Sequence, residues 1–218
     1  MKLSKNTIDV LKNFASINPN ILIRAGDSVS TISAGKNIFA KAKINETFDR
    51  EFAIYDLNSL LATVSLADDT DILLHGDYLD VQIDSGILKY YYSDPSVIQA
   101  APDKDIEVDD YFKFSLSEEA LKTIFSTAAV SQATMFSILG DGTDVKMVIG
   151  DPKTPKSNNY QKSISKSDKT FKAYLPIDSL KIMSADYTVT VSEKKFMYFQ
   201  STNGLSRYWL ALDKDSEF

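Results

Sequence analysis

The sequence of 218 residues contains no cysteine and a single histidine, His75. The absence of cysteine excludes disulfide bonds, thiolate nucleophiles and thiolate metal sites, and it fits a reducing compartment. One histidine excludes metal sites that need two but leaves a Ser-His-Asp triad possible. Because no Gly-x-Ser-x-Gly elbow accompanies His75, we interpret it as a structural or surface residue.

Long apolar runs are also missing, because no stretch reaches 18 consecutive apolar residues. We therefore expect a protein of the cytoplasm that has no membrane partner. The formal net charge is −6, from 30 acidic and 24 basic residues. As a whole the chain should be repelled by nucleic acid at long range, so contact with DNA would need local exceptions.

Motifs that carry enzyme chemistry are not found. The acids Asp68, Asp69 and Asp71 lack the glycine and glutamate of a calcium loop. The glycine-rich segments at 140–142 and 150–153 match neither a P-loop nor a dinucleotide fingerprint and are interpreted as turns. No pair of carboxylates has a context for acid and base roles. The sequence predicts a protein that is not an enzyme and that uses no cofactor or metal ion.

Hydrophobic periodicity predicts four helices among many short strands. Helical spacing is found at residues 5–15, 57–66, 118–133 and 177–185. Period-two alternation predicts strands at 21–24, 29–33, 38–44, 51–54, 72–75, 78–83 and 87–92 in the first half, and at 111–115, 135–139, 145–149, 171–175, 187–192, 197–201 and 208–212 in the second. Short links between them favour antiparallel sheets.

A weak internal repeat suggests two similar halves. Leu3-Ser4 and the apolar residues after it superimpose on Leu116-Ser117 at an offset of 113, and Ala53 with 57–60 superimposes on Ala173 with 177–180 at an offset of 120. We predict an α+β fold of two domains, residues 1–103 and 109–218, with a connector at about 94–108. Each domain should have antiparallel sheets and two helices on one face.

Basic residues are unevenly distributed. The predicted solvent faces of the helices carry four lysines: Lys5, Lys12, Lys122 and Lys181. Residues 153–172, interpreted as an exposed loop, hold six lysines against Asp168 alone, a net charge of +5. Such positive charge could touch phosphates along one surface of an otherwise acidic protein.

Several short segments of the sequence resemble those of one protein family, in the same order and spacing. They are Met1-Lys2-Leu3-Ser4-Lys5, Leu11-Lys12-Asn13-Phe14-Ala15, Ile17-Asn18, Ala53-Ile54-Tyr55-Asp56-Leu57-Asn58 with Leu66, Asp94-Pro95-Ser96, Ala211-Leu212, Asp215-Ser216 and Phe218. They resemble the sliding clamp of T-even-type bacteriophages, the DNA polymerase processivity factor. The matching strings lie mainly in residues 1–103 and at the end of the chain, whereas residues 110–207 share only the order of elements.

The resemblance implies a DNA-clamp fold in a homotrimeric ring of six domains around duplex DNA. Lys5, Lys12, Lys122 and Lys181 would face the DNA without reading its sequence. Strand 87–92 would pair with strand 171–175 of a neighbouring subunit, so Tyr91 and Tyr174 would lie at the subunit interface.

The resemblance also implies partners: the viral DNA polymerase and an ATP-driven clamp loader, with a role in late viral transcription, in the cytoplasm of a bacterial host. An apolar pocket near the connector would receive partner tails. Its candidate residues are Val97, Ile98, Trp209 and Leu212.

Two other functional classes remain open. A phage structural or assembly protein could use duplicated antiparallel sheets without regard to DNA topology. A single-stranded-DNA-binding module could stack bases on aromatic residues such as Tyr90, Tyr91 and Tyr92. Strand alternation places Tyr91 on the face opposite Tyr90 and Tyr92, so this run alone favours neither class.

Overall fold

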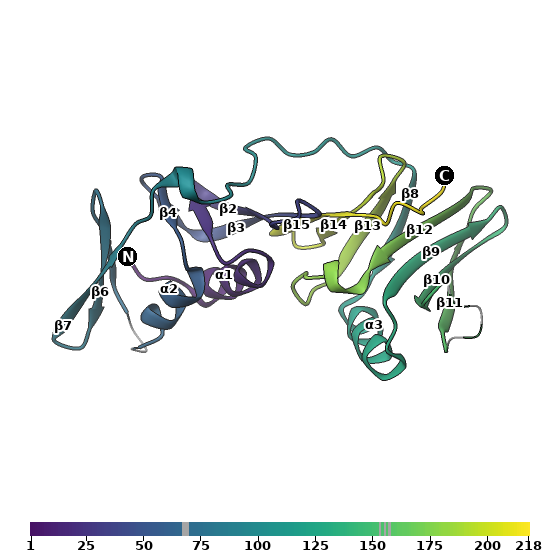
Figure 1. Cartoon of the computed structure of the whole chain (residues 1–218), viewed down its shortest axis with the longest axis horizontal. Coiled ribbons are helices and arrows are strands. Elements are labelled where there is room, and N and C mark those ends of the chain that lie inside the picture. The colour runs from purple at the N-terminus through teal and green to yellow at the C-terminus, as the bar shows by residue number, and fades with distance from the viewer. Residues whose placement is uncertain (67–69, 153, 155, 157) are drawn as a thin grey trace. The chain divides into compact units, whose positions relative to one another are not determined.

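The computed structural model describes residues 1–66, 70–152, 154, 156 and 158–218. The chain divides into two compact units, Met1–Asp105 (unit 1) and Ile106–Phe218 (unit 2). Each unit combines antiparallel strands with few helices (Figure 1). No helix in the described part of the chain is long and apolar enough to cross a membrane.

Unit 1 contains two α-helices and seven strands within its described residues. In chain order these are α1 (Lys5–Ile17), β1 (Ile21–Ile23), β2 (Gly26–Ile32), β3 (Ile38–Phe48), β4 (Phe52–Ile54), α2 (Leu57–Val64), β5 (Ile72–Leu74), β6 (Tyr78–Ile83) and β7 (Gly86–Tyr91), followed by the 3₁₀ turn η1 (Pro95–Val97). β1 pairs with β4, β2 with β3, and β5, β6 and β7 form a three-stranded sheet. Helix α1 packs against α2, β2 and β3 (Figure 1).

Unit 2 contains one α-helix and eight strands within its described residues. They are β8 (Phe112–Leu116), α3 (Glu118–Ser131), β9 (Met135–Asp141), β10 (Asp144–Gly150), β11 (Tyr160–Lys166), β12 (Thr170–Pro176), the 3₁₀ turn η2 (Ile177–Ser179), β13 (Tyr187–Ser192), β14 (Phe196–Ser201) and β15 (Ser206–Ala211). One sheet has the order β11-β10-β9-β12, and β8, β13, β14 and β15 are consecutive neighbours in another. Helix α3 packs against β10.

The two long helices begin in the same way. Ser4 and Ser117 are the N-caps of α1 and α3, and their hydroxyl oxygens accept hydrogen bonds from the N–H groups of Thr7 (3.3 Å) and Ala120 (3.1 Å). A distant carboxylate completes each cap. Glu46 accepts the N–H of Ser4 at 2.6 Å and the hydroxyl of Thr7, and the residue before β13, Asp186, accepts the N–H of Glu118 at 2.8 Å.

The buried stripes explain why these helices form. In α1, Val10, Leu11, Phe14 and Ile17 are buried, whereas Lys5 and Lys12 are exposed. In α3, Leu121, Ile124 and Ala128 are buried. The helices predicted at 5–15, 57–66 and 118–133 are confirmed, with ends that differ by up to two residues.

The helix predicted at residues 177–185 is wrong, because the chain makes only the single turn η2 there. The hydroxyl of Tyr187 donates to the carbonyl of Met183 at 2.7 Å, and the N–H of Met183 donates to the hydroxyl of Tyr208 at 3.3 Å. The hydroxyl of Tyr208 thus takes the N–H of Met183, which in a helix would donate to the carbonyl of Ser179. The described residues of unit 2 therefore contain one α-helix where two were expected.

The interpretation of the lysine-rich segment at 153–172 as an exposed loop is wrong for Tyr160–Lys166, which form β11. The strand predicted at 171–175 is confirmed as β12 (Thr170–Pro176). Strand β11 lies at the end of its sheet, and most of its side chains are exposed or half-buried. It therefore lacks the apolar alternation by which a half-buried strand is recognised.

The cap at Glu46 predicts a measurable contribution to stability. Although burial acts to raise the pKa of Glu46, hydrogen bonds from Thr7 and Ser4 lower it overall. Glu46→Gln should reduce the free energy of unfolding by about 1 kcal/mol. Because the folded pKa is below the unfolded value of about 4.3, the advantage of the wild type is full above roughly pH 5 and is lost as the pH falls through the folded pKa.

Urea unfolding over a pH series measures this difference. Asp27→Asn is the matched control, since Asp27 is an exposed carboxylate on β2 of the same unit. Equal losses for the two variants at neutral pH would show that Glu46 does not stabilise α1.

Candidate functional site

The lysines of α1 form one exposed row. Lys5 and Lys12 are seven residues apart, which places them about 10 Å apart along one side of the helix. Asp9 lies between them and is half-buried. The solvent face of α1 therefore has a net charge of +1.

The other two helices add no positive charge. Helix α2 contains no charged residue. In α3, Lys122 is exposed, but its ammonium group lies 2.7 Å from a carboxylate oxygen of Glu118, and Glu119 is in the same first turn. The hydrogen bond from Lys122, with a second from Ser184, lowers the pKa of Glu118, so this acid is charged at neutral pH. Acids and bases balance across α1, α2 and α3.

Lys181 does not lie on a helix. It follows η2 in the segment that replaces the predicted helix, and its side chain is exposed. The structure thus places Lys5, Lys12 and Lys122 on the solvent faces of helices, as predicted. The prediction that Lys181 also lies on a helix is wrong.

The aromatic run at residues 90–92 follows the alternation of a strand end. Tyr90 donates its hydroxyl to the carbonyl of Asp56 at 2.8 Å, and the ring of Tyr92 stacks on Phe52. Tyr91 is 67% exposed and contacts Tyr78 on the other face. The three rings therefore do not form one platform on which successive bases could stack.

Tyr91 lies on β7, an edge of the sheet β5-β6-β7. Most of the side chains of this strand are exposed, including Ile87 at 62%. The other edge of the sheet is partly covered, because Lys2 forms an antiparallel bridge with Asp71 and the N–H of Ile72 donates to the carbonyl of Met1. Strand β7 is thus an exposed edge in unit 1, as predicted.

The expected pairing of strand 171–175 with a neighbouring subunit would need an open edge on β12, and the structure shows that this edge is covered. The N–H of Asp213 donates to the carbonyl of Tyr174 at 2.8 Å, and Lys172 and Glu217 exchange backbone hydrogen bonds of 2.8 and 2.9 Å. The N–H of Tyr174 donates to the hydroxyl of Ser216 at 3.0 Å. The last residues of the same chain therefore occupy the edge on which Tyr174 lies. The exposed edge of this sheet is β11.

The candidate pocket residues differ in exposure. In unit 1, Val97 is 61% exposed and Ile98 is half-buried. In unit 2, Trp209 and Leu212 are buried. The indole N–H of Trp209 donates to the carbonyl of Ile106 at 3.1 Å. Trp209 and Leu212 therefore belong to the packed interior of unit 2 rather than to an open pocket wall.

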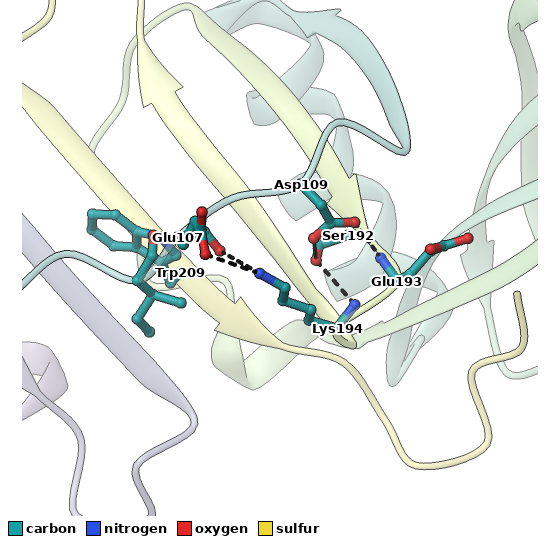
Figure 2. A network of polar contacts seen from close by, with 7 residues as sticks. Glu107, Asp109, Ser192, Glu193, Lys194 and Trp209 are labelled. Atoms are coloured by element: carbon teal, nitrogen blue, oxygen red, sulfur yellow. Dashed lines mark hydrogen bonds and ion pairs between the residues drawn. The ribbon is translucent and has the colours of Figure 1, made fainter.

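The connector is fastened to each unit by its acidic residues. In unit 1, Arg24 binds Asp103 at 2.6 Å and donates to the carbonyl of Ala101, and Lys41 lies 3.0 Å from Asp105. In unit 2, Figure 2 shows Glu107 beside Lys194 and Asp109 beside the turn that follows β13. Asp109 accepts hydrogen bonds from the hydroxyl of Ser192 and from the N–H of Glu193, the latter at 3.0 Å. Sequence reasoning missed these contacts, although acids at every second residue from 103 to 109 were the available signal.

The remaining sequence candidates make local contacts or lie outside the described residues. His75 stacks on Tyr78, and its Nε2 lies 2.9 Å from Asp80. Asp71 lies 3.9 Å from the amino group of Met1, whereas Asp68, Asp69 and Lys153 lie outside the described residues. Within the described ranges, no three acidic or histidine side chains gather closely enough to hold a metal ion.

Comparison with known proteins shows which proteins this chain resembles. Residues 2–98 match the model of the DNA polymerase processivity factor family. The chain is 28% identical over 199 residues to the sliding clamp of Vibrio phage KVP40, covering 88% of this chain and 90% of the relative. It is 35% identical over 108 residues to the sliding clamp of Enterobacteria phage T4, covering 49% and 47% of the two chains. The chain is thus similar to the sliding clamps of T-even-type bacteriophages.

The clamp fold extends over the whole chain. The structure of A. fulgidus PCNA bound to the C-terminal region of FEN-1 aligns with a TM-score of 0.71 at 15% identity, covering 99% of this chain and 98% of that one. At this identity the likeness concerns the fold. The predicted α+β clamp fold is confirmed, with one α-helix fewer than expected among the described residues of unit 2.

The contacts of Figure 2 predict unequal roles for two connector acids of this clamp. Although burial acts to raise the pKa of Asp109, hydrogen bonds from Ser192 and Glu193 lower it overall, so the charged carboxylate is the bound form. Asp109→Ala should reduce the free energy of unfolding of unit 2 by about 1–2 kcal/mol. Glu107→Ala removes the same charge but only an exposed pair, and should cost less than about 0.5 kcal/mol.

The fluorescence of Trp209, the one tryptophan in the sequence, reports this difference during urea unfolding. Equal midpoints for Asp109→Ala and Glu107→Ala would contradict the assignment of Asp109 as the anchor of the connector.

Proposed function

We propose that three copies of this chain close into a ring around duplex DNA and tether the viral DNA polymerase for processive replication. The observation that carries this proposal is the balance of charge on α1, α2 and α3, combined with a net charge of −6 for the chain. Helices with this composition would hold DNA weakly if the DNA were free to leave. Retention by enclosure removes the need for strong local contacts.

The exposed edges β7 and β11 supply the means of closure. Pairing β7 of one copy with β11 of the next satisfies the backbone groups of both strands. A head-to-tail contact of this kind closes into a ring when the rotation is three-fold. This proposal replaces the pairing of β7 with β12, because residues 213–217 already occupy the β12 edge.

Within the ring, the solvent faces of α1, α2 and α3 would line the channel. Lys5 and Lys12 would make weak, sequence-independent contacts with phosphates, and Lys122 less because Glu118 neutralises it. Lys181 would contribute from an extended segment. Water and ions between helix and phosphate would leave the ring free to slide.

The polymerase and an ATP-driven loader are the proposed partners, in the cytoplasm of the bacterial host, and late viral transcription is a further proposed role. The exposed Val97, with Ile98, would receive partner tails on unit 1. Trp209 and Leu212 are buried in unit 2 and are left out of this proposed surface. The A. fulgidus relative supports peptide recognition, since it is bound to the C-terminal region of FEN-1. The proposed role requires no catalytic step.

Enclosure predicts a dependence on DNA topology. Rings assembled from subunits in the presence of a sealed plasmid should stay bound at least tenfold longer than rings on the same plasmid cut once, because sliding off an end needs no bond to break. Gel filtration of the complexes at moderate salt measures both lifetimes. A variant with both Lys5→Ala and Lys12→Ala serves as a control. Its lifetime on the cut plasmid should be shorter than that of the wild type, whereas its lifetime on the sealed plasmid should be largely unchanged. Equal lifetimes on the two plasmids for the wild type would contradict enclosure.

The edge assignment predicts which tyrosine holds the trimer together. Tyr91→Lys places a cation beside a strand that carries Lys162 and Lys166, so the mass in solution should fall from three times 24.3 kDa to that of a single chain. Light scattering measures this mass. Tyr55→Lys is the matched control, since Tyr55 is 64% exposed but precedes α2 instead of lying on an edge strand. Tyr174→Lys should leave the trimer intact, and its dissociation would restore β12 as the interface.

A further inference from the structure

The β12 edge is occupied by an irregular segment, residues 213–217. The N–H of Ser216 donates to the carbonyl of Asp213 at 3.0 Å, and the N–H of Asp215 donates to the side chain of Asp213 at 3.0 Å. The segment therefore turns where it passes Tyr174. As a result, a side-chain hydroxyl, that of Ser216, accepts the N–H of Tyr174 in place of a backbone carbonyl. Only Lys172 and Glu217 pair as in a regular strand.

The side chains of the segment alternate across the sheet as those of an added strand would. Glu217 lies 2.9 Å from the ammonium group of Lys172 on the outer face of β12. Phe218 stacks on Phe171 and meets Tyr111 edge-on, on the opposite face. Both side chains of the Lys172–Glu217 ion pair are at least half exposed, and Phe218 is 38% exposed. These contacts therefore hold the segment weakly.

A hollow of about 490 Å³ lies on the outer face of the same sheet. Its walls include Leu139 of β9, Val148 of β10, and Lys172 and Tyr174 of β12. This volume is in the range of small-ligand and side-chain pockets. In a regular antiparallel register with Lys172 opposite Glu217, the residue opposite Tyr174 would project toward this face. The turn at 213–216 puts no such side chain there.

We propose that the β12 edge is a strand-addition site for an extended partner segment, and that residues 213–218 of this chain occupy it as a displaceable competitor. The contacts of residues 213–218 indicate the sequence of the partner segment. It should carry an acidic residue opposite Lys172, followed by an aromatic residue that packs on Phe171. Two residues before the acid, it should carry a large apolar side chain directed at the hollow. Strand addition of this kind derives affinity from main-chain hydrogen bonds and specificity from alternate side chains.

Two synthetic peptides test the site on the full-length chain. The first has the sequence of residues 211–218, and the second carries Asp215→Phe so that an apolar ring faces the hollow. Fluorescence anisotropy of the labelled peptides measures binding to the wild type, to the double variant Glu217→Ala with Phe218→Ala, and to Lys214→Ala, whose altered side chain makes none of the contacts described above.

The double variant should bind both peptides at least tenfold more tightly than the wild type or Lys214→Ala, because its own segment competes less. The second peptide should bind more tightly than the first. In the wild type, a saturating amount of the second peptide should speed hydrogen exchange in residues 213–218 and leave residues 170–176 protected.

Equal binding by the double variant and the wild type would overturn the proposal, as would the absence of binding to any variant at millimolar peptide. Binding that leaves the exchange of residues 213–218 unchanged would place the peptide elsewhere and also overturn it. Peptide binding at the β12 edge does not depend on ring formation. Measuring the solution mass of each sample shows whether the ring forms, and this result is independent of whether the peptides bind.

Discussion

Backbone N–H and C=O groups along the edge of a sheet need hydrogen-bond partners, and this requirement organises both units of the clamp chain. In unit 1 the residues before α1 bridge to β5, and in unit 2 the residues after β15 bridge to β12. The edges β7 and β11 have exposed side chains on strands at the ends of their sheets. In the proposed ring, contact between copies would give both of these edges a hydrogen-bonding partner.

The charges of the chain fit retention by enclosure rather than by attraction. Lys5 and Lys12 are the exposed bases of α1, α2 has no charge, and Lys122 is neutralised by Glu118. Strong attraction would slow sliding, since each phosphate contact must break for the protein to move. In the proposed ring, a nearly neutral helical surface would allow movement along the duplex while enclosure would prevent escape.

Local sequence patterns predicted the elements whose own residues determine them. Hydrophobic periodicity correctly placed α1, α2 and α3, and alternation placed the buried strands. The failures involve partners distant in sequence. The segment 177–185 has helical spacing, but Tyr187 and Tyr208 bind the backbone of Met183. Strand β11 has no apolar alternation because it lies at a sheet edge.

The candidate site shows the same division. The solvent positions of Lys5, Lys12 and Lys122 follow from helical periodicity alone, whereas the position of Lys181 depended on a helix that does not form. The strand that carries Tyr91 lies at a sheet edge, as its expected pairing with another subunit requires. The β12 edge is covered, and nothing near Tyr174 in the sequence shows that Asp213 and Glu217 return to it. The connector contacts of Arg24 and Asp109 likewise join residues more than 70 positions apart.

The central claim is that β7 and β11 pair between copies, and hydrogen exchange at several protein concentrations tests it most directly. On concentration from monomer to trimer, protection of residues 86–91 and 160–166 should rise together with the solution mass. Residues 170–176 should stay equally protected throughout, because their edge is covered within one chain. A trimer whose formation leaves 86–91 and 160–166 unprotected, or protects 170–176 instead, would contradict the account.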